Sequence, residues 1–132
     1  MRSSRRGFGA VIVACGAQKE LSLGVQGEDL EGVVPAMEFL SRAAAGEPAP
    51  VGERVAVVGG GNAAVDAART AVRLGAKAVK VYYRRSREEM PASPWEVEEA
   101  EREGVEISFL TNPVRFVGSG GRVVGLELQR ME

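Results

Sequence analysis

Short apolar runs alternate with amphipathic stretches along most of this chain, and glycines follow many of the segments. Four runs rich in β-branched or aromatic residues predict buried strands, at residues 10–15, 54–58, 78–83 and 105–110. Three stretches with apolar residues at helical spacing predict helices, at residues 33–45, 62–74 and 93–103. Strand and helix therefore alternate from residue 54 to residue 110, which is the βαβαβ order of a parallel sheet covered on both faces.

Local signals mark the ends of several of these elements. Ser93-Pro94-Trp95-Glu96 has the spacing of a capping box with proline at the first helical position, which predicts a helix start. Two alternating runs, 114–117 and 122–128, flank Gly118-Ser119-Gly120-Gly121 and predict a β-hairpin. The sequence thus predicts an α/β fold with three layers, in which a Rossmann-like parallel sheet (βαβαβ) is followed by a C-terminal β-hairpin.

The strongest motif lies where the strand at 54–58 meets the helix at 62–74. Gly59, Gly61 and Ala64 match G-x-G-x-x-A, with Gly60 between the two glycines of the motif. The first glycine permits a sharp turn, the second lets a pyrophosphate approach the backbone, and the alanine lets the helix lie close to the strand. Unpaired N–H groups at the helix start would then bind the anion. The alternative is a glycine-rich turn without a ligand, and a Walker-type loop is excluded because no Gly-Lys-Ser/Thr follows.

A cluster of arginines stands where this fold binds the adenosine ribose, about 20 positions after the fingerprint. Arg84 lies 20 positions after Ala64, Arg85 and Arg87 are close by, and the first acid after them is Glu88. A carboxylate here would bind the ribose hydroxyls of NAD, whereas guanidinium groups bind a 2′-phosphate through parallel hydrogen bonds. We therefore expect NADPH rather than NADH or S-adenosylmethionine, with Arg84 as the first candidate, Arg85 the second and Arg87 the third. The alternative is a solvated charged loop.

Composition excludes several other kinds of chemistry. The 132 residues contain no histidine, which removes a Ser-His-Asp triad and a histidine zinc site, and no metal site is assigned. The single cysteine, Cys15, excludes an internal disulfide, a CxxC redox pair and an iron–sulfur ligand set within the chain, and we expect it to be a buried apolar residue. A net charge of −1 lacks the basic excess of a general nucleic-acid binder.

Several polar residues near the predicted helices have structural interpretations. Asn62 either caps the helix at 62–74 or touches phosphate. Asp66 is expected to bond locally or to pair with Arg69 or Thr70. Trp95 is expected to anchor its helix, and the alternative is that it stacks on a ligand. The glutamates between residues 96 and 103 are expected to form a solvated helix face, so no general acid or base is assigned.

The N-terminus allows two interpretations. Arg5 and Arg6 precede an apolar run that ends at Cys15, which is the arrangement of a twin-arginine leader with a lipoprotein cleavage site. The apolar run from Phe8 to Ala14 has only seven residues and contains Gly9, and it equally suits a buried strand. We expect the strand and a cytoplasmic protein without a membrane segment, and an exported lipoprotein is the alternative.

Five segments of the chain together resemble a known family. In order and spacing they are similar to the pyridine-nucleotide domain of the glutamate synthase small (β) subunit and related NADPH- and FAD-dependent oxidoreductases. The segments are VIVACGAQK, GEDLEGVVPAMEFL, RVAVVGGGNAAVDAARTAVRLGA, VYYRRSREEMPA and GRVVGLELQRME. The resemblance implies that NADPH passes hydride to FAD, and that electrons continue through iron–sulfur clusters to a large partner subunit. It also implies that the pyrophosphate lies against Gly59, Gly61, Asn62, Ala63 and Ala64, and the 2′-phosphate against Arg84 and Arg85.

The chain departs from the family pattern because it contains neither an FAD fingerprint nor the cluster cysteines. We therefore expect an NADPH-binding domain that is inactive alone and whose FAD is held by parts absent from this chain. On this interpretation residues 1–17 are an exit strand and remnant of the FAD domain, residues 18–53 are a connector helix and linker, and residues 54–132 are the NADPH-binding domain. The alternative function is a non-catalytic dinucleotide-binding or sensor module.

Overall fold

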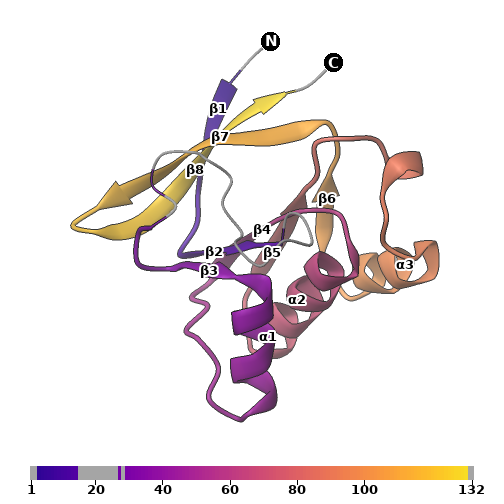
Figure 1. The fold of residues 1–132 in the computed structure, drawn as a ribbon, viewed down its shortest axis with the longest axis horizontal. Helices are drawn as coiled ribbons and strands as arrows, with labels where there is room; N and C mark the ends of the chain where they lie inside the picture. Colours follow the sequence, from indigo (N-terminus) through magenta and orange to yellow (C-terminus); the bar gives the residue numbers. More distant parts are fainter. Residues whose placement is uncertain (1–2, 15–26, 28, 131–132) are drawn as a thin grey trace.

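The structure, a computed structural model, describes residues 3–14, 27 and 29–130 and contains two β-sheets and three α-helices in this part of the chain (Figure 1). The strands are β1 (Ser3–Gly7), β2 (Ala10–Val13), β3 (Val33–Pro35), β4 (Arg54–Val58), β5 (Ala78–Tyr82), β6 (Glu106–Ser108), β7 (Thr111–Ser119) and β8 (Arg122–Arg130). The helices are α1 (Ala36–Ala44), α2 (Asn62–Arg73) and α3 (Pro94–Arg102), with a short 3₁₀ helix η1 (Arg87–Glu89). One sheet is parallel, with the order β3-β2-β4-β5-β6, and the other is antiparallel, with the order β1-β8-β7.

The parallel sheet is buried on both faces, and its strands divide their side chains between two cores. Val55 and Val57 of β4 pack with the helices, whereas Ala56 and Val58 pack with the antiparallel sheet. Figure 1 shows α1, α2 and α3 on one side of the parallel sheet and β1, β7 and β8 on the other. The prediction of three layers is confirmed, and the layer opposite the helices is a second sheet.

Helix α2 lies close to the parallel sheet because one of its faces consists of alanine. Ala64, Ala67, Ala68 and Ala71 are fully buried in the core between the helices and the sheet. Short side chains allow the backbone of a helix to approach a strand closely. This close packing fixes where the first turn of α2 stands relative to the end of β4.

Two strands form where the sequence pattern does not predict them. Val33 and Val34 pair in parallel with β2 instead of starting the helix expected at 33–45, so that α1 begins only at Ala36. Both valines are β-branched, and Pro35 lacks the N–H that a strand interior would need, so the strand ends there and the helix follows. The polar segment Ser3–Gly7 forms β1 by antiparallel pairing with β8, although it has no apolar alternation.

The predicted hairpin is confirmed and its strands are longer than the apolar pattern indicates. Ser119 pairs with Arg122 across a two-residue turn in which Gly120 and Gly121 have φ of 62° and 81°. Two positive φ values are what a type I′ hairpin turn requires, and glycine adopts them without strain. None of the helices in the described part of the chain combines the length and the apolar character that a membrane crossing requires.

The segments that the sequence analysis assigns to different units share these sheets. β2, from the first segment, lies between β3 and β4, and β1 pairs with β8. The division at residues 17/18 and 53/54 stays a prediction. Cys15 lies outside the described residues, so its expected burial also stays a prediction.

Candidate dinucleotide-binding site

The glycine loop makes the whole connection from β4 to α2, at the carboxyl edge of the parallel sheet. β4 ends at Val58 and α2 begins at Asn62, so only three glycines lie between them. Gly59 has φ of 136°, and a Cβ there would lie 2.5 Å from the carbonyl oxygen of Ala14, the residue that follows β2. A side chain fits neither this conformation nor this space. The loop therefore has the sharp turn that the sequence predicts at Gly59.

The start of α2 has the features of an anion-binding helix terminus. The N–H groups of Ala64 and Val65 donate to the carbonyl oxygen of Gly61 at 3.1 and 3.2 Å. The N–H groups of Asn62 and Ala63 have no acceptor among the residues that the structure describes. A Cβ at Gly61 would meet no described atom within 4 Å, and the first turn of α2 contains no acidic residue. Backbone donors, open space and a positive helix end thus coincide here.

The middle glycine of the loop is required by a neighbouring side chain. A Cβ at Gly60 would lie 2.5 Å from Cδ1 and from Cε1 of Tyr83, which directly follows β5. The Tyr83 hydroxyl donates a hydrogen bond of 2.9 Å to the carbonyl oxygen of Glu89. Tyr83 therefore packs against the glycine loop and at the same time closes the loop that carries the arginines.

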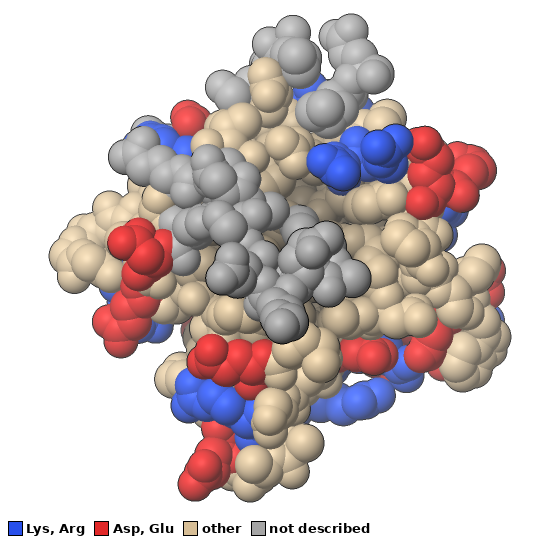
Figure 2. All heavy atoms as spheres, in the orientation of Figure 1, with Lys and Arg blue, Asp and Glu red and all other residues tan. Residues whose placement is uncertain are grey.

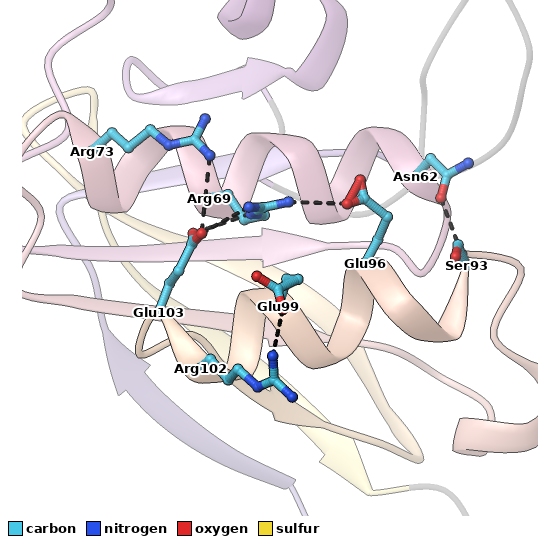
Figure 3. Close-up of polar contacts among 8 residues, drawn as sticks. All are labelled: Asn62, Arg69, Arg73, Ser93, Glu96, Glu99, Arg102 and Glu103. Carbon is cyan, nitrogen blue, oxygen red and sulfur yellow. Dashed lines mark hydrogen bonds and ion pairs between the residues drawn. The ribbon is translucent and has the colours of Figure 1, made fainter.

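Two hydrogen bonds join the glycine loop to the start of α3. The N–H of Ala92 donates to the carbonyl oxygen of Gly60 at 3.0 Å, and the N–H of Ser93 donates to Oδ1 of Asn62 at 3.2 Å. Figure 3 shows the second bond between the first turns of α2 and α3. Gly61 is the N-cap residue of α2, so the expectation that Asn62 caps this helix is wrong. Its side-chain oxygen instead fixes the relative position of two helix starts.

The arginine cluster and the glycine loop lie at the same edge of the sheet. β5 pairs with β4 up to the contact of Tyr82 with Val58, and the N–H of Gly59 donates to the carbonyl oxygen of Tyr82 at 3.0 Å. Arg84 follows two residues beyond this contact. Folds of this type bind a dinucleotide at the carboxyl ends of adjacent parallel strands, and the sequence-predicted residues meet at such a position.

The three arginines differ in what holds their guanidinium groups. Arg84 is exposed and forms no ion pair or hydrogen bond through its side chain with any described residue. Arg85 lies 3.5 Å from a carboxylate oxygen of Glu89. Arg87 forms an ion pair of 2.7 Å with Glu101, and this hydrogen bond raises the pKa of Arg87 above its ordinary value. Among the contacts of the described residues, those of Arg84 restrain its guanidinium least and those of Arg87 restrain it most.

The polar contacts between α2 and α3, drawn in Figure 3, correct the expectation for the glutamates and one of the alternatives for Asp66. The exposure of Trp95 corrects a further expectation. Arg69 pairs with Glu96 at 3.0 Å and with Glu103 at 2.7 Å, so these glutamates join two helices and do not form a simple solvated face. Asp66 is exposed and does not pair with Arg69, because the Arg69 guanidinium is directed to α3. Trp95 is 65% exposed, so it does not anchor its helix against the core.

A capping box forms at a place other than the predicted one. Ser93 is the N-cap of α3, but its side chain makes no capping bond. The reciprocal bond is absent too, because the Ser93 N–H donates to Asn62 and the Glu96 carboxylate binds Arg69. The same spacing occurs at Ser86 and Glu89, where Oε1 of Glu89 accepts hydrogen bonds from the Ser86 N–H at 3.2 Å and from its Oγ at 3.0 Å. The backbone bond first, and then the hydroxyl bond, lower the pKa of Glu89.

Sequence reasoning missed the residues that support the site. Tyr83 and Ala92 bind the glycine loop, and Ser86 with Glu89 shapes the arginine loop. The Ser-Arg-Glu-Glu spacing was a usable signal for the second pair. No sequence pattern indicates the contact of Tyr83 with Gly60, because the two residues lie in separate connections, after β5 and after β4.

Charge on the molecular face drawn in Figure 2 is mixed. Basic and acidic atoms stand next to one another around its border, without an extended region of one sign. This distribution agrees with the net charge of −1. The face drawn in Figure 2 thus offers no extended basic surface for a polyanion.

Known protein families include one whose pattern covers nearly the whole chain. The family model described as pyridine nucleotide-disulphide oxidoreductase matches residues 3–131. The chain belongs to this family. It is 44% identical over 135 residues to the NADP(+)-dependent formate dehydrogenase subunit beta of Moorella thermoacetica, a match that covers 100% of this chain and 19% of that protein.

Two further relatives have related names. The NADPH-Fe(3+) oxidoreductase subunit beta of Geobacter sulfurreducens is 44% identical over 131 residues, which cover 94% of this chain and 19% of that protein. The glutamate synthase [NADPH] small chain of Escherichia coli is 39% identical over 137 residues, which cover 95% of this chain and 29% of that protein. The chain therefore spans about a fifth to a third of the length of these family members.

Two solved oxidoreductase structures have the same fold as this chain. FprA from Mycobacterium tuberculosis in complex with NADPH superposes with a TM-score of 0.66 at 22% identity, over 92% of this chain and 43% of that one. Thioredoxin reductase from Lactococcus lactis superposes with a TM-score of 0.64 at 19% identity, over 93% of this chain and 39% of that one. At these identities the similarity concerns the fold, which is the Rossmann-like α/β fold that the sequence predicts.

Proposed function

We propose that this chain is the NADPH-binding domain of a flavin-dependent oxidoreductase that resembles the glutamate synthase small subunit. One observation carries the proposal. An open glycine loop at a helix start and an exposed arginine without an ion-pair partner in the described chain, Arg84, lie at one edge of the parallel sheet. Two separate anion-binding features on adjacent strands fit a ligand that carries both a pyrophosphate and a 2′-phosphate.

The glycine loop would hold the pyrophosphate of NADPH. The N–H groups of Asn62 and Ala63 have no acceptor among the described residues, and no described atom occupies the side of Gly61 from which an oxygen anion would approach them. The helix dipole contributes only about 0.3–1 kcal/mol at an exposed helix end. Direct hydrogen bonds from the backbone therefore supply most of the binding, and this requires the glycines that keep the backbone accessible.

Arg84 and Arg85 would select the phosphorylated dinucleotide over NADH. A guanidinium binds a phosphate with two parallel hydrogen bonds, and NADH offers only hydroxyls at this position. Arg87 remains the third candidate, because Glu101 already engages its guanidinium. No acidic residue precedes Glu88 in this loop, so nothing in this stretch opposes a 2′-phosphate.

The chemistry that NADPH supplies is a hydride, which a flavin accepts. This chain's own residues would bind and orient the dinucleotide, and none of them is assigned as an acid or a base. A single cysteine cannot form a redox disulfide within the chain, whatever the family name. Since the chain spans only 19–29% of the relatives' length, we place the FAD site in residues outside those printed here. A larger glutamate synthase-like subunit is the proposed partner, because the relatives are named as subunits or small chains.

Flavin reduction in the protein that includes its FAD-binding part tests this proposal. NADPH is expected to reduce the flavin at a lower half-saturating concentration than NADH. Replacing both Arg84 and Arg85 with alanine should raise that concentration for NADPH at least about tenfold, since hydrogen bonds to charged groups contribute about 1.5–3 kcal/mol each. The maximal rate should change little. Arg73→Ala is the matched control, because Arg73 is exposed at the opposite end of α2.

The alternative function, a non-catalytic dinucleotide-binding or sensor module, gives a different result in the same experiment. NADPH would bind with the same arginine dependence but would reduce no flavin. Equal half-saturating concentrations for NADPH and NADH would instead contradict the assignment of the arginines.

A further inference from the structure

We propose that Tyr83 is the positioning residue that sets the preference for the 2′-phosphorylated dinucleotide, an inference that rests on the proposed function. Tyr83 is 9% exposed and directly precedes Arg84. Its ring packs against the backbone of Gly60, in the loop assigned to the pyrophosphate. Its hydroxyl donates to the carbonyl oxygen of Glu89, at the far end of the loop assigned to the 2′-phosphate. One side chain thus contacts both loops.

The backbone of Tyr83 is held by the neighbouring strands. Its N–H donates to the carbonyl oxygen of Ser108 at 2.9 Å, and its own carbonyl oxygen accepts the N–H of Thr111 at 3.0 Å. The carbonyl oxygen of Arg85 accepts the N–H of Leu110 at 3.1 Å, and Leu110 has an unusual φ of 56° for a residue other than glycine. The root of the arginine loop is therefore fixed to the sheet, and Tyr83 is the rigid point from which the loop extends.

Beyond this root, the arginine loop depends on one internal pair, Ser86 with Glu89, and on contacts of Arg87 outside the loop. Ser86 bonds to Glu89, and Arg87 pairs with Glu101 and lies 5.0 Å above the ring of Phe109. These contacts shape the end of the loop but do not reach Gly60. The Tyr83 hydroxyl adds a bond to Glu89 that joins the two ends of the loop 84–89. The ring of the same tyrosine lies against Gly60, so this bond also ties the arginine loop to the glycine loop.

This arrangement lowers the ordering cost of binding a 2′-phosphate. Long exposed side chains such as those of Arg84 and Arg85 lose rotamer freedom when they bind, and a mobile backbone would add to this cost. A loop that is already closed by the Tyr83 hydroxyl presents both guanidinium groups from a fixed backbone. The pyrophosphate loop gains nothing from the hydroxyl, since only the ring touches Gly60.

Calorimetric titration of the chain with NADPH and with NADH tests the role of the hydroxyl. Tyr83→Phe keeps the ring on Gly60 and removes only the bond to Glu89. We expect the dissociation constant for NADPH to rise about fivefold, as for the loss of one ordinary hydrogen bond, while that for NADH stays within about twofold. Ser86→Ala should also raise the dissociation constant for NADPH, because it removes the hydroxyl bond between Ser86 and Glu89 within the arginine loop. Arg42→Met is the control, since it removes a side-chain bond of 3.3 Å to a backbone carbonyl oxygen, that of Glu47, outside both loops, and it should alter neither constant.

A background that lacks the arginines separates positioning from a general structural role. In a variant with Arg84→Ala and Arg85→Ala, Tyr83→Phe should weaken NADPH no further, because the groups that it positions are absent. The inference is overturned if Tyr83→Phe weakens the binding of NADPH and of NADH equally. It is also overturned if Tyr83→Phe weakens NADPH binding as much in the variant without the two arginines as in the unchanged protein. If the unchanged protein binds NADPH and NADH equally well, the proposed function fails instead.

Discussion

Three consecutive glycines in this molecule have three different reasons to be glycine. Gly59 has a positive φ and lies against the carbonyl of Ala14, Gly60 lies against the ring of Tyr83, and Gly61 has no described atom within reach of a Cβ. The first two constraints belong to the folded chain itself. The third belongs to the proposed ligand, because a side chain at Gly61 would clash with nothing that the structure describes.

Gly60→Ala should therefore lower mainly the stability of the fold, whereas Gly61→Ala should lower mainly the affinity for NADPH. Gly60→Ala pushes a methyl group into the Tyr83 ring and should lower the free energy of unfolding by about 1–3 kcal/mol, as overpacking does. Gly61→Ala should leave that free energy close to its original value, since φ is −88° there. It should instead weaken NADPH binding. Urea unfolding and calorimetric titration of both variants measure the two effects, and an equal loss of stability in both would contradict the distinction.

The sequence indicates some of these residues and not others for a physical reason. The dinucleotide-binding fingerprint indicates Gly59, Gly61 and Arg84, because each of its positions has a stated role toward the ligand. Gly60 and Tyr83 depend on a contact between residues 23 positions apart, in the loops that follow β4 and β5, which no local pattern predicts. Asn62 shows the same limit, because its partner is the backbone of Ser93 rather than its own helix.

Between elements, the strongest polar link joins α2 to α3 through Arg69. Its guanidinium reaches Glu96 and Glu103, and the side chain of Arg69 is only 17% exposed. The hydrogen bonds from Arg69 hold the pKa of Glu103 below its ordinary value. The glycine loop and the start of α3 are joined at the other end of the same helix pair by Asn62 and Ser93, so this packing also supports the site.

The lowered pKa of Glu103 predicts how stability depends on pH. Because the folded-state pKa is below the unfolded one, about 4.3 for glutamate, the ionised form is favoured by folding. This contribution to the free energy of unfolding is complete above the unfolded pKa and is lost as the pH falls through the folded pKa. Glu89, whose pKa is also lowered, adds in the same direction. Arg69→Met should reduce the stability at pH 7 and flatten its acid dependence.

Urea unfolding between pH 7 and pH 3 measures this dependence. Arg102→Met is the matched control, because its ion pair with Glu99 lies within α3 and is exposed. Exposed pairs of this kind contribute little, so its acid profile should follow that of the unchanged protein. An unaltered profile in Arg69→Met would show that Glu103 does not depend on Arg69.

The elements that the sequence predicts correctly are those with a strong local pattern. The alanine-rich helix after the glycine loop, the strands at 54–58 and 78–82, and the hairpin with adjacent glycines all form close to their predicted positions. β1 and β3 were missed because each exists through pairing with a distant strand, β8 and β2 respectively. A short or polar edge strand has little periodicity of its own, so its partner decides whether it forms.

For the molecule as a whole, the antiparallel sheet replaces a second layer of helices. Phe116, Val123, Leu126 and Leu128 of β7 and β8 form a core with the side of β2, β4 and β5 that faces away from α2. The candidate site lies at the carboxyl edge of the parallel sheet, whose two faces pack against the helices and against the antiparallel sheet. We therefore expect the two cores to set stability and the edge to set binding.

Leu126 tests this separation because it is fully buried in the second core. Leu126→Ala should lower the free energy of unfolding by about 2–5 kcal/mol, since a large side chain leaves a cavity in a packed core. Val124→Ala, on the exposed face of the same strand, should stay within about 0.5 kcal/mol. Urea unfolding measures both values. At temperatures where each variant is folded, its dissociation constant for NADPH should be unchanged, and a loss of affinity in Leu126→Ala would mean that the core shapes the site directly.

The most direct measurement is a calorimetric titration of the chain with NADPH and NADH, before and after Arg84→Ala. We predict that the unchanged chain binds NADPH at least about tenfold more tightly than NADH, and that the substitution removes most of this difference without altering NADH binding. Equal affinities for the two dinucleotides in the unchanged chain, or a preference that survives the loss of Arg84 and Arg85 together, would contradict the account.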